Sequence, residues 1–189
     1  DREEFDRFQE WAQGQIALLT LAPEREDALQ LITHICRNYK TRISLGHHLA
    51  DRETIRLAAD AGATLITHLG NGCPSMLPRH ENILMHQLVN DSLMAGLITD
   101  GHHLPADFIR IALRCKSPER VFVVSDMAPI AGFEPGVYET LGNRVRLTAT
   151  GRIENVETPY FVGSGCTMAQ CMRFLRSLGV LSEDDLWRV

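Results

Sequence analysis

The chain of 189 residues contains no apolar run that approaches the ~20 residues of a membrane-spanning helix. Its opening segment, DREEFDRFQEW, is not typical of a signal peptide. The cysteines show no CxxC spacing and no disulfide framework of a small secreted fold; they are Cys36, Cys73, Cys115, Cys166 and Cys171. Reduced thiols in a cytoplasmic protein are the better interpretation. We therefore expect a cytoplasmic protein without a membrane partner.

Long stretches of basic residues are also missing. The formal net charge is −5, and no Lys/Arg stripe offsets it, which argues against a nucleic-acid partner. A local positive pocket can still bind an anionic substrate. What is present, 44% hydrophobic and 23% charged residues, suits one α/β globular domain.

Short apolar runs alternate with helical patterns along the first two thirds of the chain. We expect strands at residues 15–22, 42–45, 63–67, within 92–99 and at 120–125. Helices are predicted at residues 3–12, 25–39, 51–61 (with Asp51 as N-cap), 81–90 and 105–115. Consecutive βα units with short connections imply a parallel sheet with right-handed crossovers.

The pattern changes after residue 126. Residues 129–161 carry glycines, prolines and short alternating stretches, which predict a β-hairpin excursion or lid. Helices are expected again at residues 168–178 and near the end of the chain.

Polar side chains stand where the predicted strands end: His47, His68, His102, His103 and Asp126. The carboxyl ends of parallel strands are the usual place of a TIM-barrel active site. A whole (β/α)8 barrel needs roughly 250 residues, so we expect a partial catalytic barrel over residues 1–189, with strands four to eight and the excursion. An isolated half-barrel would expose two strand edges. We therefore interpret the sequence as part of a longer chain.

His47 and His68 end neighbouring predicted strands, so their imidazoles are expected several ångströms apart, close enough to share a divalent ion. The alternative is that each caps a strand by bonding a loop carbonyl. Asp126 suits a general base on a water whose pKa a metal lowers, or an N-cap or Asx-turn aspartate.

His102 and His103 cannot both face the site, because adjacent strand residues face opposite sides. One of them could bind a substrate oxygen, with Asp100 orienting its ring. Residues 68–84 contain Asn71, Gly72 and Arg79, which suit an anion site or an ordinary surface loop. The segment GSGCTM at residues 163–168 suits an anion-friendly helix start or a tight packing turn.

Taken in order, TLAPE, GHHLA, THLGNGCP, LITDGHHL, VVSDMAPIAG and GSGCTM resemble the successive motifs of the N-acetylglucosamine-6-phosphate deacetylases, in the amidohydrolase superfamily. The order and spacing of the motifs carry the resemblance. It implies that His47 and His68 are metal ligands, that Asp126 is the general acid/base and that His103 contacts the substrate. Glu24, in TLAPE, has no metal role in this resemblance.

The resemblance also assigns the phosphate site. Asn71 and Gly72 would hold the sugar phosphate, and Arg79 would reach it from the neighbouring subunit of a homodimer. The family's remaining metal ligand, a glutamate in His-Leu-Glu-Gly-Pro, would lie before Asp1, together with the N-terminal strands and the small β-sandwich domain. The family's Asn-Ala-Met is Asn71-Gly72-Cys73 here, a departure in the loop that lines the sugar pocket.

The implied reaction is metal-dependent hydrolysis of the N-acetyl group of an amino-sugar 6-phosphate, giving acetate and the amino-sugar phosphate. Zinc is the first expectation for the ion, with iron or another divalent metal as the alternative. Two other functions stay open: a superfamily hydrolase acting on a cyclic amide or nucleobase, and a metal-free sugar-phosphate-binding homologue.

Overall fold

The computed structural model describes all 189 residues. They form two compact units, Asp1–Gly96 and Leu97–Val189.

The first unit is built on a parallel sheet of β1 (Leu18–Leu21), β2 (Arg42–Leu45), β3 (Leu65–Ile66) and the start of β4 (Met94–Ile98). Each strand pairs in parallel with the next. The register sets Leu21 opposite Leu45 and Leu45 opposite Ile66, so β1, β2 and β3 end level with one another. The residues that follow these strands therefore emerge at one edge of the sheet.

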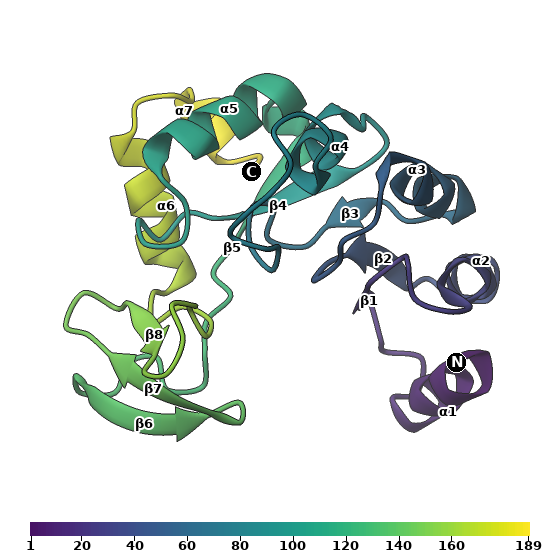
Figure 1. Ribbon diagram of the computed structural model, residues 1–189, viewed down its shortest axis with the longest axis horizontal. Coiled ribbons are helices and arrows are strands. Elements are labelled where there is room, and N and C mark those ends of the chain that lie inside the picture. The colour runs from purple at the N-terminus through teal and green to yellow at the C-terminus, as the bar shows by residue number, and fades with distance from the viewer. The chain divides into compact units, whose positions relative to one another are not determined.

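Helices α1 (Arg2–Trp11), α2 (Ala28–Asn38), α3 (Arg52–Ala61) and α4 (Ile83–Val89) complete this unit. Figure 1 shows α2 and α3 side by side along strands β1 to β3. Their apolar faces include Ile32 and Ile55, which are fully buried; burial of each such side chain contributes about 1.5–3 kcal/mol. Asp51 caps α3 as predicted, because its side chain accepts a hydrogen bond from the Thr54 amide.

The second unit contains the end of β4, α5 (Ala106–Lys116), the 3₁₀ turn η1 (Pro118–Arg120), β5 (Val121–Val124), α6 (Met168–Ser177) and α7 (Glu183–Leu186). β5 follows β4 in the strand order of the sheet, and α6 packs against β5. A single parallel bridge joins Met127 to Ser164. The GSGCTM segment therefore lies directly beside the residues that follow β5.

The predicted β-hairpin excursion is confirmed. Strands β6 (Gly136–Thr140), β7 (Asn143–Leu147) and β8 (Ile153–Asn155) form a separate antiparallel sheet, seen in green in Figure 1. This sheet has a small core of its own, formed by Ala128, Ile130, Val145, Leu147 and Ile153.

The predicted helices and strands are all present, but two strands are shorter than expected. The strand predicted at residues 15–22 is only Leu18–Leu21. The reason is a side-chain interaction: Gln9 donates to the carbonyl of Ile16 and accepts from its amide, so Ile16 is held by a helix side chain instead of a strand ladder. The strand predicted at residues 63–67 is only Leu65–Ile66.

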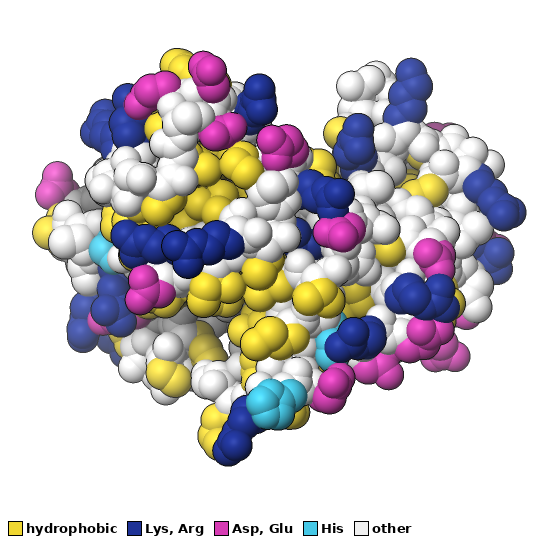
Figure 2. Space-filling view, turned by 90° about the horizontal axis from the view of Figure 1, so that it is seen from above, with side chains coloured by type: hydrophobic (Ala, Val, Ile, Leu, Met, Phe, Trp, Pro, Cys, Tyr) yellow, Lys and Arg dark blue, Asp and Glu magenta, His cyan; other side chains and the backbone are white.

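The surface carries charges of both signs. On the face shown in Figure 2, Lys and Arg side chains lie among Asp and Glu side chains, and neither sign forms a continuous field. None of the helices combines the length and apolar character needed to cross a membrane.

Candidate active site

The imidazoles of His47 and His68 meet at the edge of the first sheet. Their Nε2 atoms are 2.9 Å apart, and the ring centroids are 4.7 Å apart at an interplanar angle of 80°. His68 is buried, with 7% of its surface exposed, whereas His47 is exposed. Two imidazole nitrogens bound to one tetrahedral zinc ion at about 2.0–2.1 Å each lie about 3.3 Å apart. The spacing of this pair therefore fits a shared divalent ion.

Backbone strain accompanies both histidines. His47 has φ +51° and His68 has φ +30°, conformations that cost a non-glycine residue on the order of 1–3 kcal/mol and cluster at functional sites. The preceding Gly46 is tightly enclosed, because a Cβ there would lie 2.7 Å from Thr20 Cγ2 and from Thr67 Cβ. The close fit between neighbouring strands therefore holds the turn that carries His47.

Two further side chains hold the loop after β2. Glu24 accepts a 2.8 Å hydrogen bond from the Leu49 amide, which gives this residue a structural role at its strand end. His48 is buried, its Nδ1 accepts from the Ala50 amide at 3.3 Å and its Nε2 lies 2.9 Å from Gln87 Nε2. Burial lowers the pKa of His48. Of the two histidines in the GHH segment, only His47 contacts His68.

The loop after β3 covers the histidine pair. Gly72 has φ +65°, and a Cβ there would lie 3.0 Å from His47 Nδ1 and 3.1 Å from His68 Cε1. The neighbouring Asn71 has a buried Nδ2 without a hydrogen-bond partner. Such a group costs about 1–3 kcal/mol, and a bound acceptor such as a phosphate oxygen would satisfy it. Arg79, farther along, is exposed and has no partner within the chain.

Asp126, in the second unit, follows β5 and has φ +50°. It is exposed, and its carboxylate accepts no hydrogen bond from the turn that follows, unlike the Asx-turn or N-cap alternative. Its backbone carbonyl accepts from the Ser164 amide at 2.8 Å, and a Cβ on Gly163 would lie 2.9 Å from this carbonyl oxygen. The GSG segment is thus a tight packing turn beside Asp126. Convergence of Asp126 with the two histidines stays a prediction.

The prediction that Asp100 orients one of the two adjacent histidines is confirmed. His103 Nδ1 lies 2.7 Å from Asp100 Oδ2, and these side chains are only 6% and 1% exposed. His102 diverges, with its Nε2 2.9 Å from the carbonyl oxygen of Thr150. Burial alone would raise the pKa of Asp100, but hydrogen bonds from His103, the amide of His102 and Ser164 outweigh it and hold this pKa well below its usual range.

The sequence analysis did not predict one aromatic neighbour of His103. The Phe161 ring, at the end of the excursion, lies 4.9 Å from the His103 ring at 59°, and the Arg152 guanidinium lies 5.0 Å from its centroid. The excursion therefore contributes a wall beside His103. No signal in the sequence links two residues so far apart along the chain.

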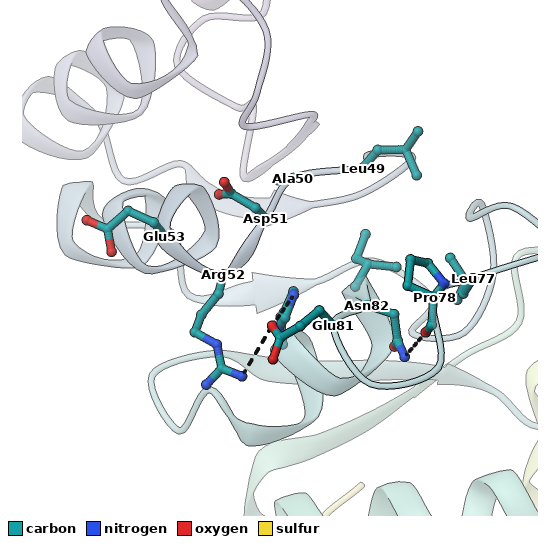
Figure 3. Close-up of a pocket in the computed structure, with 11 residues that line it drawn as sticks. Leu49, Ala50, Asp51, Arg52, Glu53, Leu77, Pro78, Glu81 and Asn82 are labelled. Carbon is teal, nitrogen blue, oxygen red and sulfur yellow. Dashed lines mark hydrogen bonds and ion pairs between the residues drawn. The ribbon is translucent and has the colours of Figure 1, made fainter.

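A pocket of about 490 Å³ lies between the start of α3 and the segment before α4 (Figure 3). Glu81 stands at its centre, 3.9 Å from Arg52 Nη2 and 3.8 Å from His86 Nε2. His86 is buried, and its Nδ1 has no hydrogen-bond partner. None of the predicted site residues lines this pocket.

The two imidazole nitrogens are spaced so that they could act as two ligands of one metal ion. No group of three or more His, Cys, Asp or Glu side chains is arranged to hold an ion, whereas catalytic zinc sites use three protein ligands and a water. The pair fits part of such a set.

Comparison with known proteins supplies the class. No family model matches the chain. A variant of N-acetyl-D-glucosamine-6-phosphate deacetylase from Mycobacterium smegmatis, solved in complex with N-acetyl-D-glucosamine-6-phosphate, superposes with a TM-score of 0.88 at 28% identity, over 100% of this chain and 49% of that one. The fold is therefore that of the TIM-barrel amidohydrolases.

Sequence relatives narrow the class to a family. The N-acetylglucosamine-6-phosphate deacetylase of Bacillus subtilis (strain 168) is 31% identical over 186 residues, which is 98% of this chain and 46% of that protein. The N-acetylgalactosamine-6-phosphate deacetylase of Escherichia coli O157:H7 is 31% identical over 144 residues, 76% of this chain and 38% of that protein. The chain belongs to the N-acetylglucosamine-6-phosphate deacetylase family, and it spans about half the length of the curated relatives it matches.

Proposed function

We propose that the protein containing this chain hydrolyses the N-acetyl group of an amino-sugar 6-phosphate of the N-acetylglucosamine-6-phosphate type. The observation that carries the proposal is the pair of imidazole nitrogens 2.9 Å apart at the carboxyl ends of parallel strands. Relatives named as deacetylases support the reaction class. The products would be acetate and the amino-sugar phosphate.

His47 and His68 would hold a divalent ion, zinc in the first instance, with iron or another divalent metal as the alternative. The ion would polarise the acetamide carbonyl and lower the pKa of the attacking water. Asp126 would take a proton from that water and deliver it to the leaving nitrogen, while a C–O bond forms and the C–N bond breaks. Its exposed carboxylate, without an acceptor role in the following turn, is free for this task.

The phosphate would be bound by the loop after β3. The buried, unpartnered Asn71 Nδ2 supports a contact with a phosphate oxygen, and the Gly72 amide lies in the same turn. We assign Arg79 to the phosphate bound by the neighbouring subunit of a homodimer, because this exposed side chain has no partner in its own chain. His103 would contact a substrate oxygen through Nε2. All five cysteines are unpaired, which supports a cytoplasmic location.

The decisive assay measures acetate released by the purified full-length protein from the 6-phosphates of N-acetylglucosamine and N-acetylgalactosamine, alongside cyclic amides and nucleobases. We expect turnover of at least one amino-sugar phosphate, loss of turnover after chelation, and recovery on adding zinc or iron. Turnover of only a ring substrate would replace the proposal with the other hydrolase function. A protein with no turnover and no stoichiometric metal would instead be a sugar-phosphate-binding homologue.

A further inference from the structure

Asp100 is the most completely bonded carboxylate in the second unit. Its Oδ1 accepts from the backbone amides of His102 and His103 at 2.8 Å and 2.9 Å. Its Oδ2 accepts from the Ser164 hydroxyl at 2.7 Å and faces His103 Nδ1 at the same distance. One oxygen therefore fixes the loop, and the other fixes the imidazole.

The protonation of the Asp100 carboxyl determines which His103 nitrogen carries a proton. Hydrogen bonds keep Asp100 ionised, and an ionised carboxylate can only accept. His103 Nδ1 must therefore donate to Oδ2, which also accepts from the Ser164 hydroxyl. In the neutral ring the proton therefore resides on Nδ1, which leaves a lone pair on Nε2.

Neighbouring side chains restrict the position of the His103 ring and leave only Nε2 open to a ligand. The Phe161 ring lies 4.9 Å from the imidazole, and the His103 side chain is 6% exposed. Ser164 is itself fixed, because its Oγ accepts from the Cys166 amide at 3.1 Å. His103 Nε2 makes no hydrogen bond within the chain, so it is the ring atom available to a ligand.

The geometry points to Asp100 as a positioning residue, with Ser164 as its support, which sets the tautomer and orientation of His103. This inference rests on the proposed function, in which His103 contacts substrate. Nε2 would accept a hydrogen bond from a substrate hydroxyl in the neutral ring and donate one to a substrate oxygen once protonated. Removing the partner that orients a metal-ligating histidine through its other nitrogen usually lowers activity by about 10–100-fold, and we expect a loss of similar size here.

Replacement of Asp100 by asparagine gives a specific test. The asparagine side chain should place its single oxygen at the Oδ1 position, because two backbone N–H groups donate there. The amide NH₂ group then takes the Oδ2 position and donates to His103 Nδ1. The loop is kept, but the neutral ring must move its proton to Nε2.

The experiment uses the full-length protein labelled with ¹⁵N-histidine, observed above about pH 7.5, where imidazole is mainly neutral. His103→Gln identifies the His103 signals by difference. We expect Nδ1–H in the wild type and Nε2–H in Asp100→Asn. Ser164→Ala should retain Nδ1–H, because the carboxylate remains. The matched control is Asp107→Asn, because the Asp107 carboxylate lies in the same unit and is 91% exposed. In this variant His103 should retain Nδ1–H.

Kinetics on the same variants complete the test. We expect kcat/KM to fall by about 100-fold in Asp100→Asn, mainly through kcat, by tenfold or less in Ser164→Ala, and by less than twofold in Asp107→Asn. An unchanged tautomer in Asp100→Asn, or Nε2–H in the wild type, would overturn the inference. If His103→Gln keeps full turnover, the proposed role of His103 fails, while the NMR result still decides whether Asp100 sets its tautomer.

Discussion

The two units hold the histidines of the candidate site by different means. In the first unit, His47 and His68 both adopt positive φ in turns that end parallel strands, so backbone packing directs their rings. In the second unit, Asp100, Ser164 and Phe161 hold His103 through its side chain. A backbone change should therefore disrupt the first arrangement, and an isosteric side-chain change the second.

The largest effect is expected when the proposed acid/base Asp126 and the proposed metal ligand His68 are replaced separately. Asp126→Asn in the full-length protein should lower kcat by roughly 10²–10⁴-fold, the usual contribution of a general acid/base, while the metal stays bound. His68→Asn, in the first unit, should lower both the metal content and kcat. Acetate release and elemental analysis on the same preparations measure the two effects. Wild-type turnover in Asp126→Asn would remove this residue from its role.

A backbone test addresses the first unit. Gly46→Ala places a Cβ 2.7 Å from Thr20 and Thr67 side-chain atoms, which should lower the free energy of unfolding by about 1–3 kcal/mol, as overpacking does, and weaken metal binding. Gly136→Ala is the matched control, because its nearest neighbour would be at 3.4 Å. Denaturant unfolding and metal titration provide the readouts. Equal effects of the two substitutions would show that the enclosed turn is unimportant.

A pH series addresses the second unit. Hydrogen bonds lower the pKa of Asp100 from its ordinary value of 3.8, so the stability it contributes is present above about pH 4 and is lost as the pH falls toward the folded-state pKa. Asp100→Asn should therefore be less stable than wild type by about 1–3 kcal/mol near pH 7, and the gap should narrow below pH 4. Urea unfolding from pH 7 to 3 measures it. A gap independent of pH would contradict this account.

The smallest effect concerns the thiols near Asp100. Burial, together with the charge of Asp100, raises the pKa of Cys171 to about 11 and also raises that of Cys166, whereas Cys115 is exposed. Iodoacetamide at pH 8, followed by mass spectrometry, should modify Cys115 well before the two buried thiols. Equally fast modification of all three would show that this region is open in solution.

Local sequence patterns predicted the strand ends, the histidine pair and one helix cap. Alternating apolar runs placed the strand ends, and the chain positions of His47 and His68 after those strands predicted that their rings would be near each other. Asp51 and its place before a helical pattern predicted an N-cap that the structure confirms.

The features that sequence could not supply come from long-range contacts and local strain. Ser164 reaches Asp100 across 64 positions, and Phe161 reaches His103 from the far end of the excursion. Gln9 shortens β1 by binding Ile16 from a helix. Positive φ at His47, His68 and Asp126 could not be located from residue type alone, because only a few per cent of non-glycine residues adopt it, although Asp and His are enriched among them.

The most direct measurement of the central claim is X-ray absorption and anomalous diffraction on the purified full-length protein. We predict one divalent ion bonded to Nε2 of His47 and to Nε2 of His68, at about 2.0–2.1 Å for zinc. A protein that hydrolyses the amino-sugar phosphate while its metal lies elsewhere, or while it holds none, would contradict the account.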